Sequence, residues 1–107
     1  MNNKIEIRRD LSIQTAHMPY YAQYMATQLQ EDLGLKWGWT SPCSISFEAE
    51  TGLAKGTKGT LRLDGSVVIL DITLPFMLAA MRPTIERKID EKLGALVQMA
   101  QQAAAAG

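Results

Sequence analysis

Apolar and polar residues alternate on both sides of Asp64-Gly65, and this pattern predicts a β-hairpin. An Asp-Gly pair between two alternating runs is a strong hairpin signal, because both central residues of a type I′ turn need a positive φ. Three cross-strand pairs are expected with a two-residue loop, namely Leu63 with Ser66, Gly59 with Leu70 and Lys58 with Asp71. The core-directed face would then carry Leu61, Leu63, Val68, Leu70 and Ile72.

Three shorter stretches also alternate and predict strands with one buried face. The first spans residues 4–9 and places Ile5 and Ile7 on its apolar side. The second spans residues 35–40 and carries both tryptophans on one face. The third would direct the following residues into the core: Cys43, Ile45, Phe47 and Ala49.

Two segments repeat apolar residues at intervals of three and four, which predicts amphipathic helices. The first helix should begin near Met18, after a looser turn at residues 11–17, and end at Gly34. The second should begin around Pro83, so that the stretch from Leu53 to Leu93 contains the hairpin and most of this helix. Its apolar stripe consists of Ile85, Ile89, Leu93, Leu96 and Val97.

The predicted order of elements is β-α-β-β-β-β-α, which indicates an α+β fold. We expect an antiparallel sheet of four to five strands with both helices on one face, similar to a reduced helix-grip arrangement. The first strand should return beside the fifth, giving the order 1-5-4-3-2. Residues 1–97 would form one domain, and residues 98–107 an Ala/Gln-rich tail that extends the helix or is disordered.

Composition narrows the classes of function. Eleven basic and eleven acidic residues balance within the 107 residues, so no net charge favours nucleic acid. The N-terminus lacks the apolar core of a signal peptide, and the longest apolar run, residues 74–81, falls short of the ~20 residues of a transmembrane helix. The expectation is a cytoplasmic protein without a transmembrane segment.

Few residues offer catalytic chemistry, and each has a plainer interpretation. His17 is the only histidine and Cys43 the only cysteine, so no two-histidine metal site and no internal disulfide can form within one chain. Glu48 and Glu50 share a strand face, where a solvated surface is the more common arrangement. We therefore expect no catalytic, metal-binding or cofactor-binding site.

An apolar connection between Pro75 and Pro83 is the strongest candidate surface. Its side chains Phe76, Met77, Leu78 and Met81 are expected to bind a surface or a partner, because flexible methionines suit adaptable apolar contacts. The alternative is that they cover the core. Val67 and Ile69, on the outer face of the hairpin, are rival candidates that would pair two copies of the chain back to back.

A pocket is the other possibility that the pattern raises. Gly59 leaves space on the core face, which a helix, a ring such as that of Trp39 or a ligand would fill. The candidate lining is therefore Trp39, Gly59 and Leu70.

Several of these segments resemble the polyhydroxyalkanoic acid system protein family over roughly residues 4–95. The resemblance rests on the run Gly56 to Leu63, the alternation from Val68 to Leu74, and the later segments Phe76-Met77-Leu78, Ile85-Glu86 and Ile89 through Leu93. It extends more weakly upstream, at Leu11-Ser12, Leu33-Gly34-Leu35 and Trp39. Members are encoded beside bacterial storage-polyester genes. The resemblance implies a polyester-granule context and no established molecular activity.

Three functions follow from this reading. The first is a non-enzymatic protein that binds the granule surface or granule proteins, in the cytoplasm or on the granule. The second is a carrier that encloses an acyl chain between the sheet and the last helix, by analogy with helix-grip folds. The third is an enzyme of hydroxyacyl metabolism, which the missing set of nucleophile, base and orienting group disfavours.

Overall fold

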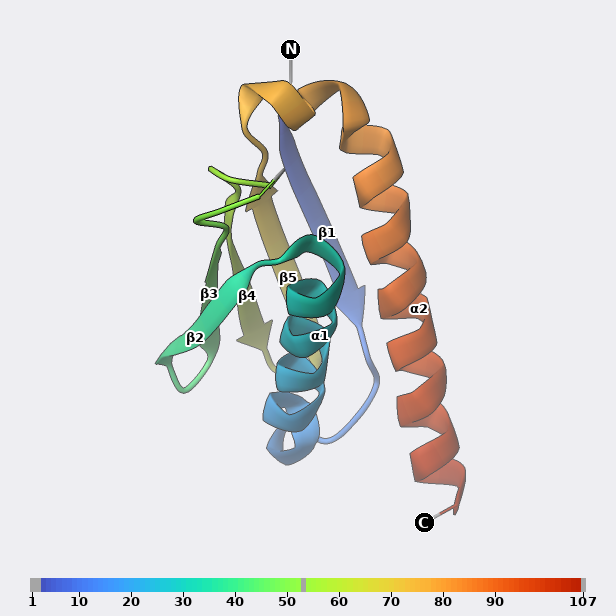
Figure 1. The fold of residues 1–107 in the computed structure, drawn as a ribbon. Coiled ribbons are helices and arrows are strands. Elements are labelled where there is room, and N and C mark those ends of the chain that lie inside the picture. The colour runs from blue at the N-terminus through green and yellow to red at the C-terminus, as the bar shows by residue number, and fades with distance from the viewer. Residues whose placement is uncertain (1–2, 53, 107) are drawn as a thin grey trace.

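The computed structural model of the chain describes residues 3–52 and 54–106. Met1, Asn2, Leu53 and Gly107 lie outside the described residues, so the expected start of the hairpin stretch at Leu53 and the last residue of the expected tail are outside them too. The described residues form an α+β fold, in which an antiparallel sheet is covered on one face by two helices (Figure 1).

The five strands lie in the order β1-β5-β4-β3-β2, and the predicted order is confirmed. β1 pairs with β5 along its whole length, which brings the beginning of the chain beside the end of the hairpin. The elements are β1 (Lys4–Asp10), η1 (Thr15–His17), α1 (Met18–Leu33), β2 (Lys36–Ser41), β3 (Ser44–Glu48), β4 (Lys58–Asp64), β5 (Val67–Thr73), η2 (Phe76–Met81) and α2 (Arg82–Ala106).

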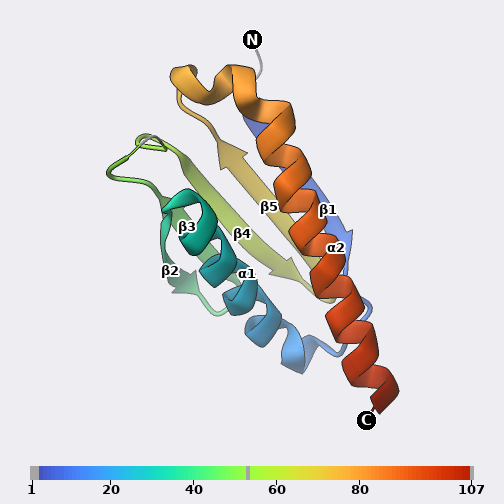
Figure 2. The same ribbon diagram turned by 45° about the vertical axis from the view of Figure 1, so that its right-hand side comes forward.

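The two helices lie side by side on the sheet (Figure 2). α1 begins at Met18 with Pro19 in its first turn, where the missing N–H of proline costs no helical hydrogen bond. It ends at Gly34, whose φ of 69° is a left-handed conformation that glycine adopts without strain. α2 runs on to Ala106, so the described part of the expected tail is helical and Ala100 is buried.

The core lies between the sheet and the helices and confirms the predicted faces. On the hairpin, Leu61, Val68, Leu70 and Ile72 are buried, and Leu63 is half-buried. The apolar stripe of α2 packs onto the same cluster, with only Val97 half-buried. Burying each such side chain is worth about 1.5–3 kcal/mol by transfer.

The register of the hairpin differs from the prediction by two residues. Leu63 lies opposite Val68, not Ser66, and the two-residue loop is Gly65-Ser66. Gly65 has a φ of 61°, whereas Ser66 is not among the described residues with positive φ. Glycine at the first central position is typical of a type II′ turn, which needs only one positive φ.

Cross-strand partners change accordingly. Lys58 lies opposite Thr73 and not opposite Asp71, and Gly59 lies opposite Ile72 and not opposite Leu70. The predicted faces are nevertheless correct, because a register shift of two residues leaves every side chain on the same face of the sheet.

Cys43 is also placed differently from the prediction. Ser41 pairs with Ser44, so Pro42 and Cys43 form the turn between β2 and β3. The thiol is exposed there and does not join the core. β3 begins one residue later than expected, and Ile45 and Phe47 supply its buried face.

Candidate interaction site

The predicted apolar connection forms a short 3-10 helix, η2, at the end of β5. Pro75 is extended (φ −66°, ψ 159°) and cannot continue the ladder, because it has no N–H to donate. Leu78 donates its N–H to the carbonyl of Pro75 over 2.9 Å, and this bond closes the first turn. The chain then enters α2 at Arg82.

This connection is anchored at its start and again within η2. Asn3 holds Leu74 by two hydrogen bonds, because its side-chain amide donates to the carbonyl of Leu74 (2.7 Å) and its own carbonyl accepts from the N–H of Leu74 (2.8 Å). Leu74 and Ala79 are buried. The backbone of η2 is therefore fixed on the domain before and within the helix.

Three large apolar side chains of η2 are nevertheless exposed to solvent. Phe76 is 89% exposed, Met77 86% and Met81 50%, while Leu78 is half-buried against the core. We call Phe76, Met77 and Met81 the η2 surface. The two most exposed side chains do not cover the core, which was the alternative interpretation.

No charged residue occurs in η2 itself. The first one along the chain is Arg82, whose guanidinium lies 3.2 Å from the carboxylate of Glu86 one helical turn later. This pair neutralises the charge next to the η2 surface, which leaves an apolar segment suited to an apolar partner.

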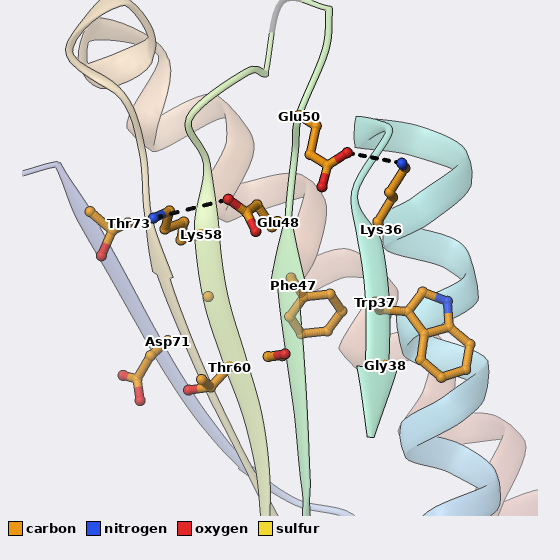
Figure 3. A pocket seen from close by; sticks show the side chains of 12 residues that line it. Lys36, Trp37, Gly38, Phe47, Glu48, Glu50, Lys58, Thr60, Asp71 and Thr73 are labelled. Carbon is orange, nitrogen blue, oxygen red and sulfur yellow. Dashed lines mark hydrogen bonds and ion pairs between the residues drawn. The ribbon is translucent and has the colours of Figure 1, made fainter. Parts of the chain in front are cut away.

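The face of the sheet that carries no helix has a different character (Figure 3). It contains a shallow hollow of about 560 Å³ that is lined by residues of β2, β3, β4 and β5. Lys36 lies 3.0 Å from Glu50, and Lys58 lies 4.0 Å from Glu48. β3 ends at Glu48, so Glu50 follows the strand and does not share a strand face with Glu48 as expected. Each glutamate lies beside an exposed lysine, and such surface pairs are worth ~0–1 kcal/mol.

The structure does not bring Trp39, Gly59 and Leu70 together in one pocket. Leu70 is fully buried in the core. Gly59 lies against the backbone of β5, where an added Cβ would come within 2.4 Å of the carbonyl oxygen of Asp71. Trp39 lies on the edge strand β2, where its indole N–H donates to the side chain of Gln23 over 3.4 Å.

A groove between the two helices was not expected from the sequence. It has a volume of about 440 Å³, and its apolar lining includes Leu29, Leu33, Ile85 and Ile89. Lys92 of α2 forms an ion pair with Asp32 of α1 at this groove. The helical periodicity predicted both apolar stripes, but it carries no information on how far apart the helices lie.

Residues 3–52 and 54–106 contain no cluster of three or more His, Cys, Asp or Glu side chains that could hold a metal ion. His17 and Cys43 are exposed, on η1 and in the β2–β3 turn. In the same part of the chain, no helix has the length and apolarity to cross a membrane.

Comparison with known protein families identifies a relationship for most of the chain. Residues 5–97 match the model of a family described as "Putative polyhydroxyalkanoic acid system protein". The match covers β1 through most of α2 and includes η2. No curated protein matches the chain.

Proposed function

The chain belongs to the polyhydroxyalkanoic acid system protein family, and we propose that it is a non-enzymatic protein that binds the surface of the storage granule through the η2 surface. It would act in the cytoplasm, where it binds the granule directly or through the proteins that coat it. The observation that carries the proposal is the exposure of Phe76 and Met77 on an anchored backbone.

The free energy lost by leaving apolar side chains in water supports this assignment. Fully burying a phenylalanine or methionine side chain is worth about 1.5–3 kcal/mol, so two such residues left in solvent forgo a sizeable contribution to folding. Leu74 and Ala79 show that the same segment can bury apolar side chains. A polyester inclusion, which family membership associates with this chain, would offer an apolar surface for the exposed ones.

The non-enzymatic part of the proposal rests on the side chains that could do chemistry. Glu48 and Glu50 each face a lysine on the open sheet face. Cys43 is exposed in a turn of β-structure, and His17 lies in a 3-10 turn before α1. None of these residues belongs to a described set of nucleophile, base and orienting group.

The experiment is flotation of granules from polyester-producing cells. Wild-type protein should float with the granules, and Phe76→Ser combined with Met77→Ser should shift it to the soluble fraction. A matched control replaces two exposed aromatic residues elsewhere, Tyr20→Ser with Tyr24→Ser, and should leave flotation unchanged. Both double variants must have the circular dichroism spectrum of the wild-type protein, so that a change in flotation is not caused by unfolding. A wild-type protein that stays soluble, or an η2 variant that still floats, contradicts the proposal.

The groove between α1 and α2 favours a second candidate, a carrier of an acyl chain. Most of its lining is apolar, and its two lysines, Lys88 and Lys92, are balanced by two acids, Asp32 and Glu91, so the groove would suit the apolar part of an acyl chain. Ala95 lines the groove and is exposed, so Ala95→Trp should fill it without disturbing the core. Saturable binding of a fluorescent fatty acid that Ala95→Trp abolishes would support the carrier; binding unaffected by this variant would exclude the groove.

A further inference from the structure

The two edges of the sheet differ in how well they are protected from pairing with another strand. β1 carries five charged residues, Lys4, Glu6, Arg8, Arg9 and Asp10, and Arg9 forms an ion pair with Asp90 of α2. β2, at the other edge, contains a single charged residue, Lys36. Charged side chains are a common device against edge-to-edge association, so β2 is the more open edge.

Hydrogen bonds around β3 show which backbone groups of β2 face outward. Leu63 donates to the carbonyl of Cys43 (2.8 Å), and Ala49 donates to that of Thr57 (2.9 Å). Backbone groups alternate in direction along an antiparallel strand, so odd-numbered residues of β3 bond to β4 and even-numbered ones to β2.

The same alternation fixes the orientation of β2. The backbone groups of Lys36 and Gly38 hydrogen-bond to β3, because these residues lie opposite Glu48 and Ser46. The backbone N–H and C=O groups of Trp37 and Trp39 therefore point away from β3, toward the outer edge of the sheet. No other strand in the described part of the chain pairs with β2 at this edge.

We propose that β2 pairs antiparallel with β2 of a second copy of this chain, with the two-fold axis passing at Gly38. Trp37 would then lie opposite Trp39 of the partner subunit, and their outward-facing backbone groups would exchange hydrogen bonds. The symmetry repeats this pair on the other side of the axis. The two sheets join into one continuous sheet with the helices of both copies on the same face.

This register suits the residues of β2. Gly38 on the axis forms a non-hydrogen-bonded pair, the position where the strands come closest, at about 4.5 Å between Cα atoms. Lys36 lies opposite Thr40 of the partner subunit, so no like charges meet. The indole N–H groups of Trp37 and Trp39 already have partners in Gln30 (2.9 Å) and Gln23 (3.4 Å) on α1, so pairing leaves neither of them unsatisfied.

The pairing has a natural end and leaves the η2 surface free. The register of β2 with β3 shifts between Trp39 and Ser41, and an irregularity of this kind stops a strand from extending its ladder. η2 follows β5 and lies away from β2 (Figure 1). Both copies would keep the η2 surface exposed, and dimerisation is independent of the proposed granule binding.

Disulfide trapping tests the register. In a Cys43→Ser background, Gly38→Cys places two thiols on the axis, whereas Thr40→Cys places them four residues apart along the strand, about 13 Å. A disulfide needs Cα atoms within ~7 Å. The structure leaves open space at the Cβ position of Gly38, so this variant should fold. Mild oxidation should give a covalent dimer with Gly38→Cys and little with Thr40→Cys.

Sedimentation of the unmodified chain is the second measurement. It should show a species of doubled mass that dissociates on dilution. Trp39→Pro, which removes an outward N–H, should give a monomer with native circular dichroism, while Trp39→Thr, which keeps that N–H, should retain the dimer. A wild-type monomer at every concentration, or equal trapping of both cysteine variants, would overturn the proposal.

Discussion

The hydroxyl of Ser66 donates a 2.7 Å hydrogen bond to the carboxylate of Asp10, and this contact joins the β4–β5 turn to the end of β1. The same carboxylate accepts a hydrogen bond from the N–H of Ser12 (2.8 Å), and Leu11 donates to the carbonyl of Ser66 (2.9 Å). The bonds from the Ser66 hydroxyl and from the Ser12 N–H lower the pKa of Asp10 below its ordinary value of 3.8, the Ser66 hydroxyl contributing most. They fix the point at which the chain leaves the sheet for α1.

Ser66→Ala should therefore destabilise the domain at neutral pH, and its effect should shrink in acid. A carboxyl group with a lowered folded-state pKa stabilises the fold above its unfolded pKa, and this contribution is lost as the pH falls through the folded value. Urea unfolding of both proteins at neutral pH and at a pH of about 2 measures the change. Ser44→Ala, on the open face, should show no such pH dependence. A difference that stays constant with pH would mean that the Asp10–Ser66 bond does not lower the pKa of Asp10.

The alternation of residues predicted the faces of the hairpin but not its register. Side-chain direction repeats every two residues, so Leu61 and Leu70 reach the core whether the loop is Asp64-Gly65 or Gly65-Ser66. Only the turn decides between these registers, and Gly65 is a central residue in both. The hydrogen bonds that join Ser66 to Asp10 and Leu11 are long-range contacts, which a local pattern of residues does not contain.

Two strand glycines should respond very differently to alanine. At Gly59 an added Cβ would lie 2.4 Å from the carbonyl oxygen of Asp71 and 3.2 Å from the Cα of Ile72, so the backbone of β5 must move. At Gly38 nothing lies within 4 Å. We expect Gly59→Ala to cost about 1–3 kcal/mol, as overpacking does, and Gly38→Ala to be neutral.

Chemical denaturation of both glycine variants at one dilute protein concentration makes this comparison. Equal stability of the two would show that β4 and β5 are not as close at Gly59 as the structure places them. The sequence suggested spare room at Gly59, whereas the room is taken by the neighbouring strand itself.

Thr57 precedes β4 and is buried, yet its hydroxyl has no hydrogen-bond partner among the described residues. An unsatisfied buried polar group costs ~1–3 kcal/mol, and valine has nearly the same shape without the hydroxyl. Thr57→Val should therefore be at least as stable as the wild type in thermal unfolding. Thr60→Val, on an exposed position of β4, serves as the control. A clear loss of stability in Thr57→Val alone would show that the hydroxyl does find a partner.

The candidate surface was easier to predict than the grooves. Phe76, Met77 and Met81 are exposed as expected, because two prolines bound a connection too short to bury every apolar side chain. The residues proposed for one pocket, Trp39, Gly59 and Leu70, proved to lie apart, since a face assignment gives no position along the strand. The groove between α1 and α2 depends on helix packing, which periodicity alone does not specify.

Near the end of β5, substitutions only two or three residues apart should differ sharply in their effect on the free energy of unfolding. Leu74 is 2% exposed, and its backbone is held by Asn3, so Leu74→Ala should cost about 2–5 kcal/mol through the cavity that it leaves. Phe76 and Met77 are almost fully exposed, so replacing each with serine should change the free energy of unfolding by no more than ~0.5 kcal/mol. Urea unfolding followed by circular dichroism measures all three variants. If the Phe76→Ser and Met77→Ser variants lose as much stability as Leu74→Ala, these side chains pack on the domain in solution and the η2 surface is not available to a partner.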